Sequence, residues 1–85
     1  MRHASIEDLK NLEDLLDNIR KIRNIREKTP GHFYFKGKGI LHFHTDFGKL
    51  YADLYDMRID MGSMEHPSEE MKRYLILLIE EYSIE

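Results

Sequence analysis

The stretch HFYFKGKGILHFHTDFGKLYADLY, residues 32–55, contains three segments in which apolar and polar side chains alternate. Such alternation is typical of β-strands that bury one face and leave the other face open. The segments are separated by GKG at 37–39 and by DFGK at 46–49, and both separators suit hairpin turns. The sequence therefore predicts an antiparallel meander with strands over about 32–36, 40–45 and 50–55.

The alternation assigns each residue of this meander to one of two faces. The apolar face carries Phe33, Phe35, Leu41, Phe43, Leu50, Ala52 and Leu54. The opposite face carries His32, Tyr34, Ile40, His42, His44, Tyr51, Asp53 and Tyr55. Turn length sets the register, because a hairpin pairs the residues that are equally far from its turn. A three-residue first turn places His32 opposite His44, and a four-residue second turn places His42 opposite Asp53.

The segment before the meander has the pattern of an amphipathic helix. Its apolar residues recur at steps of three and four and are Ile6, Leu9, Leu12, Leu15, Leu16, Ile19, Ile22 and Ile25. Ser5 and Asp8 form a variant of the capping box, and Pro30 with Gly31 supplies a stop signal. We therefore expect a helix over residues 5–28.

The C-terminal part predicts a further strand and a second helix. Residues 57–61 alternate again but out of step with Leu54, so a bend near Tyr55 and Asp56 is expected before a continued or fourth strand. Pro67 suits the first helical position of a helix over residues 67–82. Its apolar stripe consists of Met71, Tyr74, Leu75, Leu78, Ile79 and Tyr82. Ile76 and Leu77 widen that stripe, which favours packing from two sides and a second subunit.

These elements predict a single α+β domain over residues 1–85, a two-layer sandwich of order α-β-β-β-(β)-α. Both helices are expected on the apolar face of the antiparallel meander, which leaves the His/Tyr face open. No apolar run approaches the ~20 residues that a membrane-spanning helix needs. The chain has no cysteine, so a metal site would use His and carboxylates. We expect a cytoplasmic protein.

The open face offers ligands for a divalent transition metal. His42 and His44 are two residues apart on one strand, so their side chains project from the same face about 6.5–7 Å apart. His32 or Asp53 would supply a further ligand, and neutral imidazole suits zinc, nickel, copper or ferrous iron. If Asp53 instead hydrogen-bonds His42, it orients that imidazole without binding the ion.

Three other roles are open to the same face. Self-association, most simply as a homodimer, or another protein contact is the favoured role, because a small chain leaves tyrosines, histidines and Ile40 uncovered. Single-stranded nucleic acid is an alternative partner, since residues 20–49 hold eight Lys/Arg against two acids although the net charge is −3. Its binding face would comprise Tyr34, Tyr51, Tyr55, Lys36 and Lys38. A His42–Asp53 dyad is the basis for catalysis, but no convincing nucleophile or phosphate loop accompanies it, so the sequence favours a non-enzyme.

Residues 30–54 also resemble a recurring pattern. The elements of the pattern are Pro-Gly before an aromatic strand, a Lys-Gly-Lys-Gly hairpin, Leu-His-Phe-His-x-Asp and Tyr-Ala-Asp. The pattern resembles that of small uncharacterised prokaryotic proteins, to which no activity is attached. The resemblance implies that His42, His44, Asp46 and Asp53 belong to one recurring unit.

Overall fold

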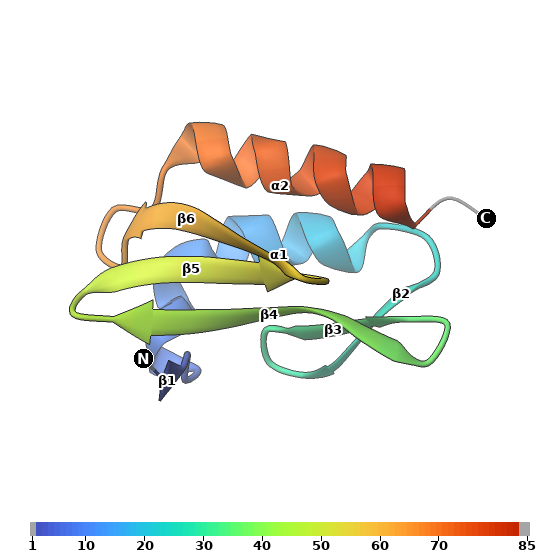
Figure 1. The fold of residues 1–85 in the computed structure, drawn as a ribbon, viewed down its shortest axis with the longest axis horizontal. Coiled ribbons are helices and arrows are strands. Elements are labelled where there is room, and N and C mark those ends of the chain that lie inside the picture. Colours follow the sequence, from blue (N-terminus) through green and yellow to red (C-terminus); the bar gives the residue numbers. More distant parts are fainter. Residues whose placement is uncertain (1, 84–85) are drawn as a thin grey trace.

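The structure, a computed structural model, describes residues 2–83 and has two layers, a sheet and a pair of helices (Figure 1). The strands are β1 (Arg2–His3), β2 (Ile25–Thr29), β3 (His32–Phe35), β4 (Lys38–Asp46), β5 (Lys49–Leu54) and β6 (Met57–Ser63). The helical elements are the 3-10 helix η1 (Glu7–Leu12), α1 (Glu13–Arg20) and α2 (Glu69–Tyr82). The antiparallel sheet has the order β2-β3-β4-β5-β6, and β1 also pairs with β4. The predicted α+β fold is confirmed.

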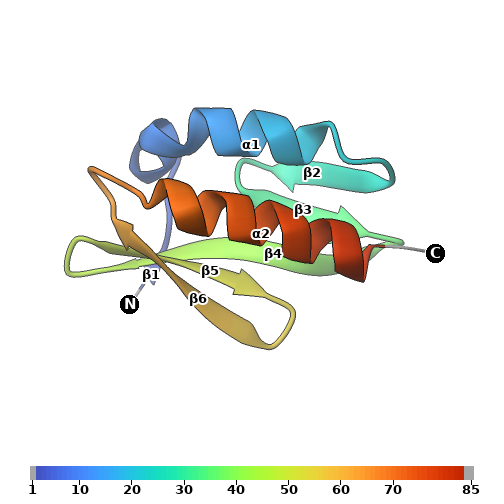
Figure 2. The ribbon, with the colours of Figure 1, turned by 90° about the horizontal axis from the view of Figure 1, so that it is seen from above.

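The two helices lie side by side on one face of the sheet (Figure 2). Between the layers lies one hydrophobic core, which contains Leu12, Leu16, Ile19, Phe33, Phe43, Leu54, Leu75 and Ile79 among its most buried residues. At the edge of this core the partly buried Lys72 Nζ links the helices, 2.8 Å from Glu69 and 3.3 Å from Asp14. The helices therefore cover the apolar face, as predicted, and no helix within residues 2–83 covers the other face of the sheet.

The predicted helix over residues 5–28 is wrong in its second half. Helix α1 ends at Arg20, and Asn24 has a φ of 71°, a left-handed conformation that a helix cannot continue through. Ile25 then begins β2 and pairs with Phe35 of β3. The Pro30-Gly31 pair forms the turn between β2 and β3 instead of ending a helix. Pairing with β3 and burial of Ile25 therefore override a local pattern that also fits a helix.

The predicted capping box at Ser5 is present. The Ser5 Oγ accepts a hydrogen bond of 3.2 Å from the Asp8 N–H, and the Asp8 carboxylate accepts one of 2.9 Å from the Ser5 N–H. These reciprocal bonds satisfy two backbone donors at the start of the helical segment. The first turns are a 3-10 helix, and Leu9 and Leu12 on it are buried as the stripe predicted.

The register between β4 and β5 agrees with the prediction. Phe43 lies opposite Ala52, His42 opposite Asp53 and His44 opposite Tyr51. The turn itself is shorter than expected, because Asp46 also pairs with Lys49. The predicted four-residue turn and the observed two-residue turn give the same register, because both are centred on the same position in the sequence.

The predicted register between β3 and β4 is wrong. The turn is the two-residue pair Lys36-Gly37, with φ of 52° and 79°, as two-residue hairpin turns require. Phe33 consequently pairs with Leu41 and not with Phe43, and a bulge leaves Ile40 as the extra residue on β4. Ile40, which we expected on the open face, is 3% exposed and part of the core. The same shift separates His32 from the position opposite His44.

The C-terminal half follows the prediction with small changes. A turn at Tyr55 and Asp56 leads into β6, which is an antiparallel fourth strand of the meander. Helix α2 begins at Glu69 and not at Pro67, because Ser68 is its N-cap and accepts a hydrogen bond from Met71 N–H. Tyr74, Leu77 and Tyr82 remain 47%, 64% and 48% exposed, so the helices bury only part of the predicted stripe. None of the helices in residues 2–83 is long and apolar enough to cross a membrane.

Candidate metal centre

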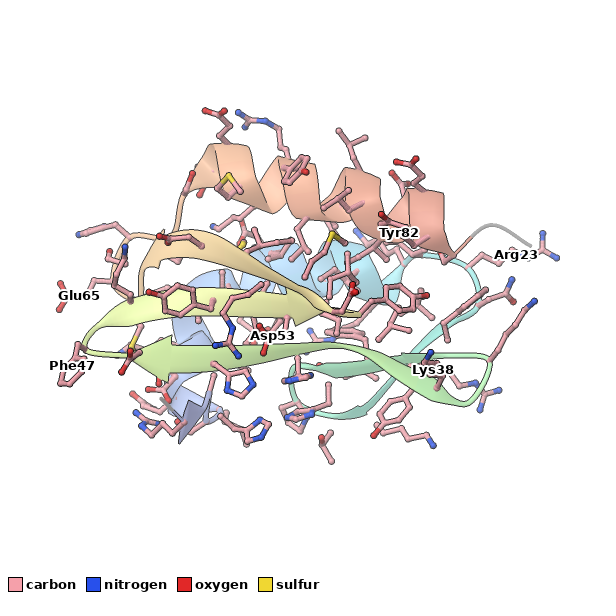
Figure 3. All side chains as sticks on the ribbon, viewed as in Figure 1. Arg23, Lys38, Phe47, Asp53, Glu65 and Tyr82 are labelled. Carbon is pink, nitrogen blue, oxygen red and sulfur yellow. The ribbon has the colours of Figure 1, made fainter. Side chains whose placement is uncertain are left out.

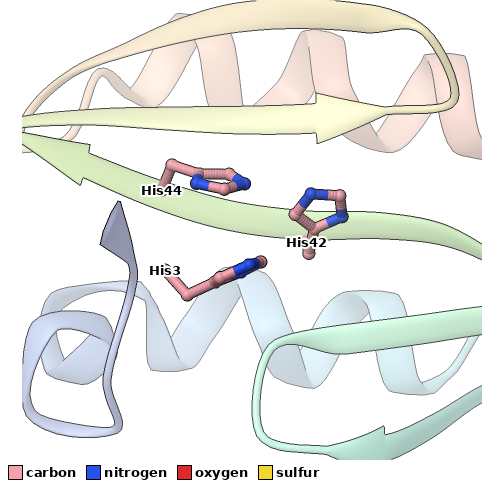
Figure 4. A group of neighbouring side chains, drawn as sticks. All are labelled: His3, His42 and His44. Carbon is pink, nitrogen blue, oxygen red and sulfur yellow. The ribbon is translucent and has the colours of Figure 1, made fainter. Parts of the chain in front are cut away.

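Three imidazoles converge on the open face of the sheet. They belong to His3 on β1 and to His42 and His44 on β4, and we call them the imidazole cluster (Figure 4). One ligand nitrogen from each ring lies within 4.8 Å of the other two. A zinc ion about 2.0–2.1 Å from each nitrogen needs them somewhat closer, a change that requires rotation of the side chains, of which that of His3 is exposed.

Strand β1 brings His3 to this cluster from the start of the chain. His3 lies opposite His44, and Ala4 N–H donates a 2.9 Å hydrogen bond to the Phe43 carbonyl. Arg2 is held by Asp8, with its Nη1 2.6 Å from the Asp8 Oδ2. The Asp8 carboxylate therefore caps the helical segment and also anchors the strand that carries His3. The Arg2 guanidinium and the Ser5 N–H lower the pKa of Asp8 to about 2.

Asp53 lies on β5 beside the cluster and opposite His42 of β4; Figure 3 labels it. Its Oδ2 is 3.0 Å from the His44 Nε2 and 3.4 Å from the His42 Nε2. Arg58 donates two hydrogen bonds to the same carboxylate, of 2.8 and 2.9 Å. Chiefly because of Arg58, the pKa of Asp53 is lowered, so its carboxylate is charged at neutral pH. A fixed negative charge beside the two imidazoles favours a bound cation.

His32 adjoins the cluster but does not converge with it. Its ring is parallel to the His42 ring, with 5.9 Å between their centroids and 11° between their planes. The position opposite His44, which the predicted register gave to His32, belongs to His3. His32 is thus the least favourably placed of the predicted ligands, and it packs against the edge of the cluster, 5.6 Å from the His3 ring.

The surroundings keep two of these histidines neutral. Burial is the main cause that lowers the pKa of His44 and that of His32 below the ordinary value of 6.5. Neighbouring imidazoles add to this effect, whereas Asp53 opposes it for His44. A neutral imidazole is the form that binds metal ions, so the lowered pKa of His44 favours metal binding by that residue.

The residues predicted for nucleic-acid binding lie on several elements around the cluster. Tyr55 lies in the β5–β6 turn, where its ring contacts Tyr82 of α2 at 5.6 Å between centroids. The Lys38 ammonium lies 5.8 Å from the Tyr55 ring. Tyr34 sits on β3 and Tyr51 on β5, on opposite sides of β4. Tyr51 pairs with His44 and so adjoins the cluster, whereas Tyr34 and Lys36 line a hollow beside β2.

His3 and Arg58 are the two site residues that the sequence did not indicate. His3 lies on a two-residue strand, which is too short to show any alternation. Arg58 lies opposite Asp53 because β6 folds back as a hairpin. The tight turn at Tyr55 and Asp56 was the available signal for Arg58. For His3 the only signal was an unusual number of histidines, five in 85 residues.

Comparison of the chain with protein-family models, with curated proteins and with solved structures gives no match. The resemblance of residues 30–54 to small prokaryotic proteins stays a prediction. The functional interpretation consequently depends on the geometry of the imidazole cluster.

Proposed function

We propose that this protein binds a divalent transition-metal ion through the imidazoles of His3, His42 and His44. The observation that carries the proposal is that three ligand nitrogens lie within 4.8 Å of one another. They come from β1 and β4, two strands that are far apart in the sequence. Three nitrogen ligands suit zinc, nickel or copper, whereas magnesium and calcium prefer oxygen ligands. Asp53 stays with Arg58 and balances the charge of the ion.

Three histidines also leave room for a further ligand. Zinc is usually four-coordinate, and a site with three protein ligands takes water or another small molecule at the fourth position. His42 has a side chain that is 37% exposed and His3 is exposed, so the ion and the fourth ligand reach the site from solvent. His32, whose ring centroid lies 5.6 Å from that of His3 and 5.9 Å from that of His42, is an alternative fourth ligand.

The test is metal binding by protein that is purified without a histidine tag. Calorimetric titration with Zn²⁺, Ni²⁺ and Cu²⁺ is compared for the wild type and for His3→Ala, His42→Ala and His44→Ala. Loss of a direct ligand should weaken binding at least as much as loss of a supporting residue, which costs about 10–100-fold. The matched control is His66→Ala, because His66 is exposed in the segment before α2 and outside the cluster.

Two results would contradict the proposal. One is that the wild-type protein binds none of the three ions with a dissociation constant in the micromolar range or below. The other is an affinity that falls equally in His66→Ala and in the three cluster variants, because binding would then not involve the cluster.

We retain two sequence predictions as part of the proposal, a cytoplasmic location and self-association. The exposed Tyr74 and Leu77 of α2 favour a contact through the helical layer as well as through the open sheet face. Light scattering of the wild type with and without Zn²⁺ tests self-association. A dimer that depends on Zn²⁺ and is lost in His3→Ala would place the contact at the cluster, whereas a metal-independent dimer would place it elsewhere.

A further inference from the structure

A second site lies at the other end of β3, between β2 and the β3–β4 turn. The structure has there a hollow of about 340 Å³, which we call the basic hollow. Its lining residues are Asn24, Arg26, Lys28, Tyr34, Lys36 and Gly37. Among these described residues three are cations and none is an acid, although the net charge of the chain is −3. Lys38 and Arg23 lie at the same end of the molecule (Figure 3).

The geometry of β2 separates its positive and negative charges. Glu27 lies between Arg26 and Lys28 but pairs in register with the buried Phe33, on the helix side. There its carboxylate accepts hydrogen bonds from the Arg20 Nε, at 2.6 Å, and from the Gly31 N–H, at 2.9 Å. Within residues 2–83, Arg26 and Lys28 form no ion pair. Glu27 therefore forms its hydrogen bonds on the helix side of the sheet. The charges of Arg26 and Lys28 remain available at the hollow.

Tyr34 gives the hollow a fixed wall. The Lys28 Nζ lies 4.4 Å from the centroid of the Tyr34 ring, a cation–π contact. A Cβ at Gly39 would lie 3.3 Å from the Tyr34 Cε2, so the ring lies closely against β4 at this glycine. Tyr34 lies opposite Arg26 in register. Arg26 and Lys28 thus both line the hollow together with Tyr34.

Such a group of donors suits a phosphate. A guanidinium binds two phosphate oxygens in parallel, an ammonium adds a point charge, and the Asn24 amide is a further donor. The volume lies near the lower end of the range of about 300–1,000 Å³ that small-molecule sites occupy, so a group attached to the phosphate also fits. We propose that the basic hollow binds a phosphate group, carried either by a small phosphate ester or by a single-stranded nucleic acid.

The test is calorimetric titration of metal-free protein with inorganic phosphate, a nucleoside monophosphate and a short single-stranded RNA. At least one of these should bind, with an affinity that falls as salt increases. Arg26→Gln and Lys28→Gln should each weaken that binding about tenfold, since each removes a charged donor. Binding of phosphate or of the monophosphate would indicate a small ester, and binding of RNA alone would indicate a nucleic-acid strand.

The matched control is Arg73→Gln, which removes the same charge from an exposed position on α2, outside the hollow. It should leave binding unchanged. Failure of all three probes to bind, or equal weakening by Arg73→Gln, would overturn the proposal. Thermal unfolding shows whether each variant folds, and all three positions are exposed. Metal-free protein keeps this result independent of the imidazole cluster, because the two sites share no residue.

Discussion

The two faces of strand β4 differ in how far local sequence determines them. On the helix side, Leu41, Phe43 and Thr45 are 2%, 1% and 3% exposed, and they belong to a core that any register with the same parity would bury. On the other side, His42 and His44 meet His3 only because β1 lies beside β4. Burial of apolar residues is non-directional, whereas convergence of ligands depends on exact neighbours. The core face therefore tolerates errors in register that the imidazole face does not.

The largest effect is expected for a pair of substitutions on β4 that compares the two faces. Phe43→Ala should lower the free energy of unfolding by about 3–5 kcal/mol, because it leaves a cavity in the core. His42→Ala, on the neighbouring residue, should lower it by less than about 1 kcal/mol in metal-free protein. Urea unfolding of both variants measures the two values. Similar losses would show that the imidazole face also supports the fold.

A second substitution tests the carboxylate beside the cluster. Asp53→Asn removes the charged acceptor of Arg58, which should cost about 1–3 kcal/mol of stability and weaken Zn²⁺ binding about tenfold. The control is Asp60→Asn on β6, whose carboxylate is 2.9 Å from Lys49 at an exposed position. Asp60→Asn should leave Zn²⁺ affinity unchanged. Unchanged Zn²⁺ affinity in Asp53→Asn would mean that Asp53 contributes nothing to the metal site.

The anchor of β1 offers a third test. Asp8→Asn weakens the capping box and the contact with Arg2, and should cost about 1 kcal/mol. Because folding lowers the pKa of Asp8 from 3.8 to about 2, this stabilisation is present above pH 4 and is lost as the pH falls toward 2. The difference in unfolding free energy between wild type and Asp8→Asn should therefore shrink over that range. A difference that is constant with pH would contradict the assigned role of the carboxylate.

The smallest effect concerns the histidines themselves. Folding lowers the pKa values of His32 and His44 below 6.5, so the unfolded chain takes up protons first as the pH falls. Stability should then be fully present above about pH 6.5 and decrease on acidification below it. Urea unfolding of metal-free wild type at several pH values measures this, and His44→Gln should reduce the dependence. A wild type that becomes more stable between neutral pH and pH 5 would contradict these pKa directions.

Sequence reasoning predicted the β4–β5 hairpin well and the β3–β4 hairpin badly, for one physical reason. Between β4 and β5, a turn of two or four residues gives the same pairs, such as His42 with Asp53. Between β3 and β4, the turn consists of Lys36 and Gly37, and a bulge at Ile40 returns the following apolar residues of β4 to the helix side. The length of the loop therefore does not predict the register of this hairpin. An alternating pattern fixes the face of each residue but leaves shifts of two residues open.

The predicted helix fails over residues 21–28 for a related reason. Ile22 and Ile25 continue the helical spacing, whereas the alternation of β2, with Ile25 buried, Arg26 exposed and Glu27 half-buried, shows only in the fold. A short apolar pattern fits both structures, and only the presence of β3 as a partner selects the strand. The basic hollow follows from that choice, because a helix would not place Arg26 beside Tyr34.

By itself the sequence determined the α+β class, the central hairpin, the capping box and the side of the sheet on which His42 and His44 lie. These features depend on side-chain periodicity and on contacts between residues that are close in the chain. The tertiary structure alone decided that His3 completes the imidazole cluster, that Arg58 binds Asp53 and that Arg26 faces Tyr34. Each of these contacts joins different strands, and their positions depend on turn geometry, a bulge and a two-residue strand, none of which has a periodic pattern.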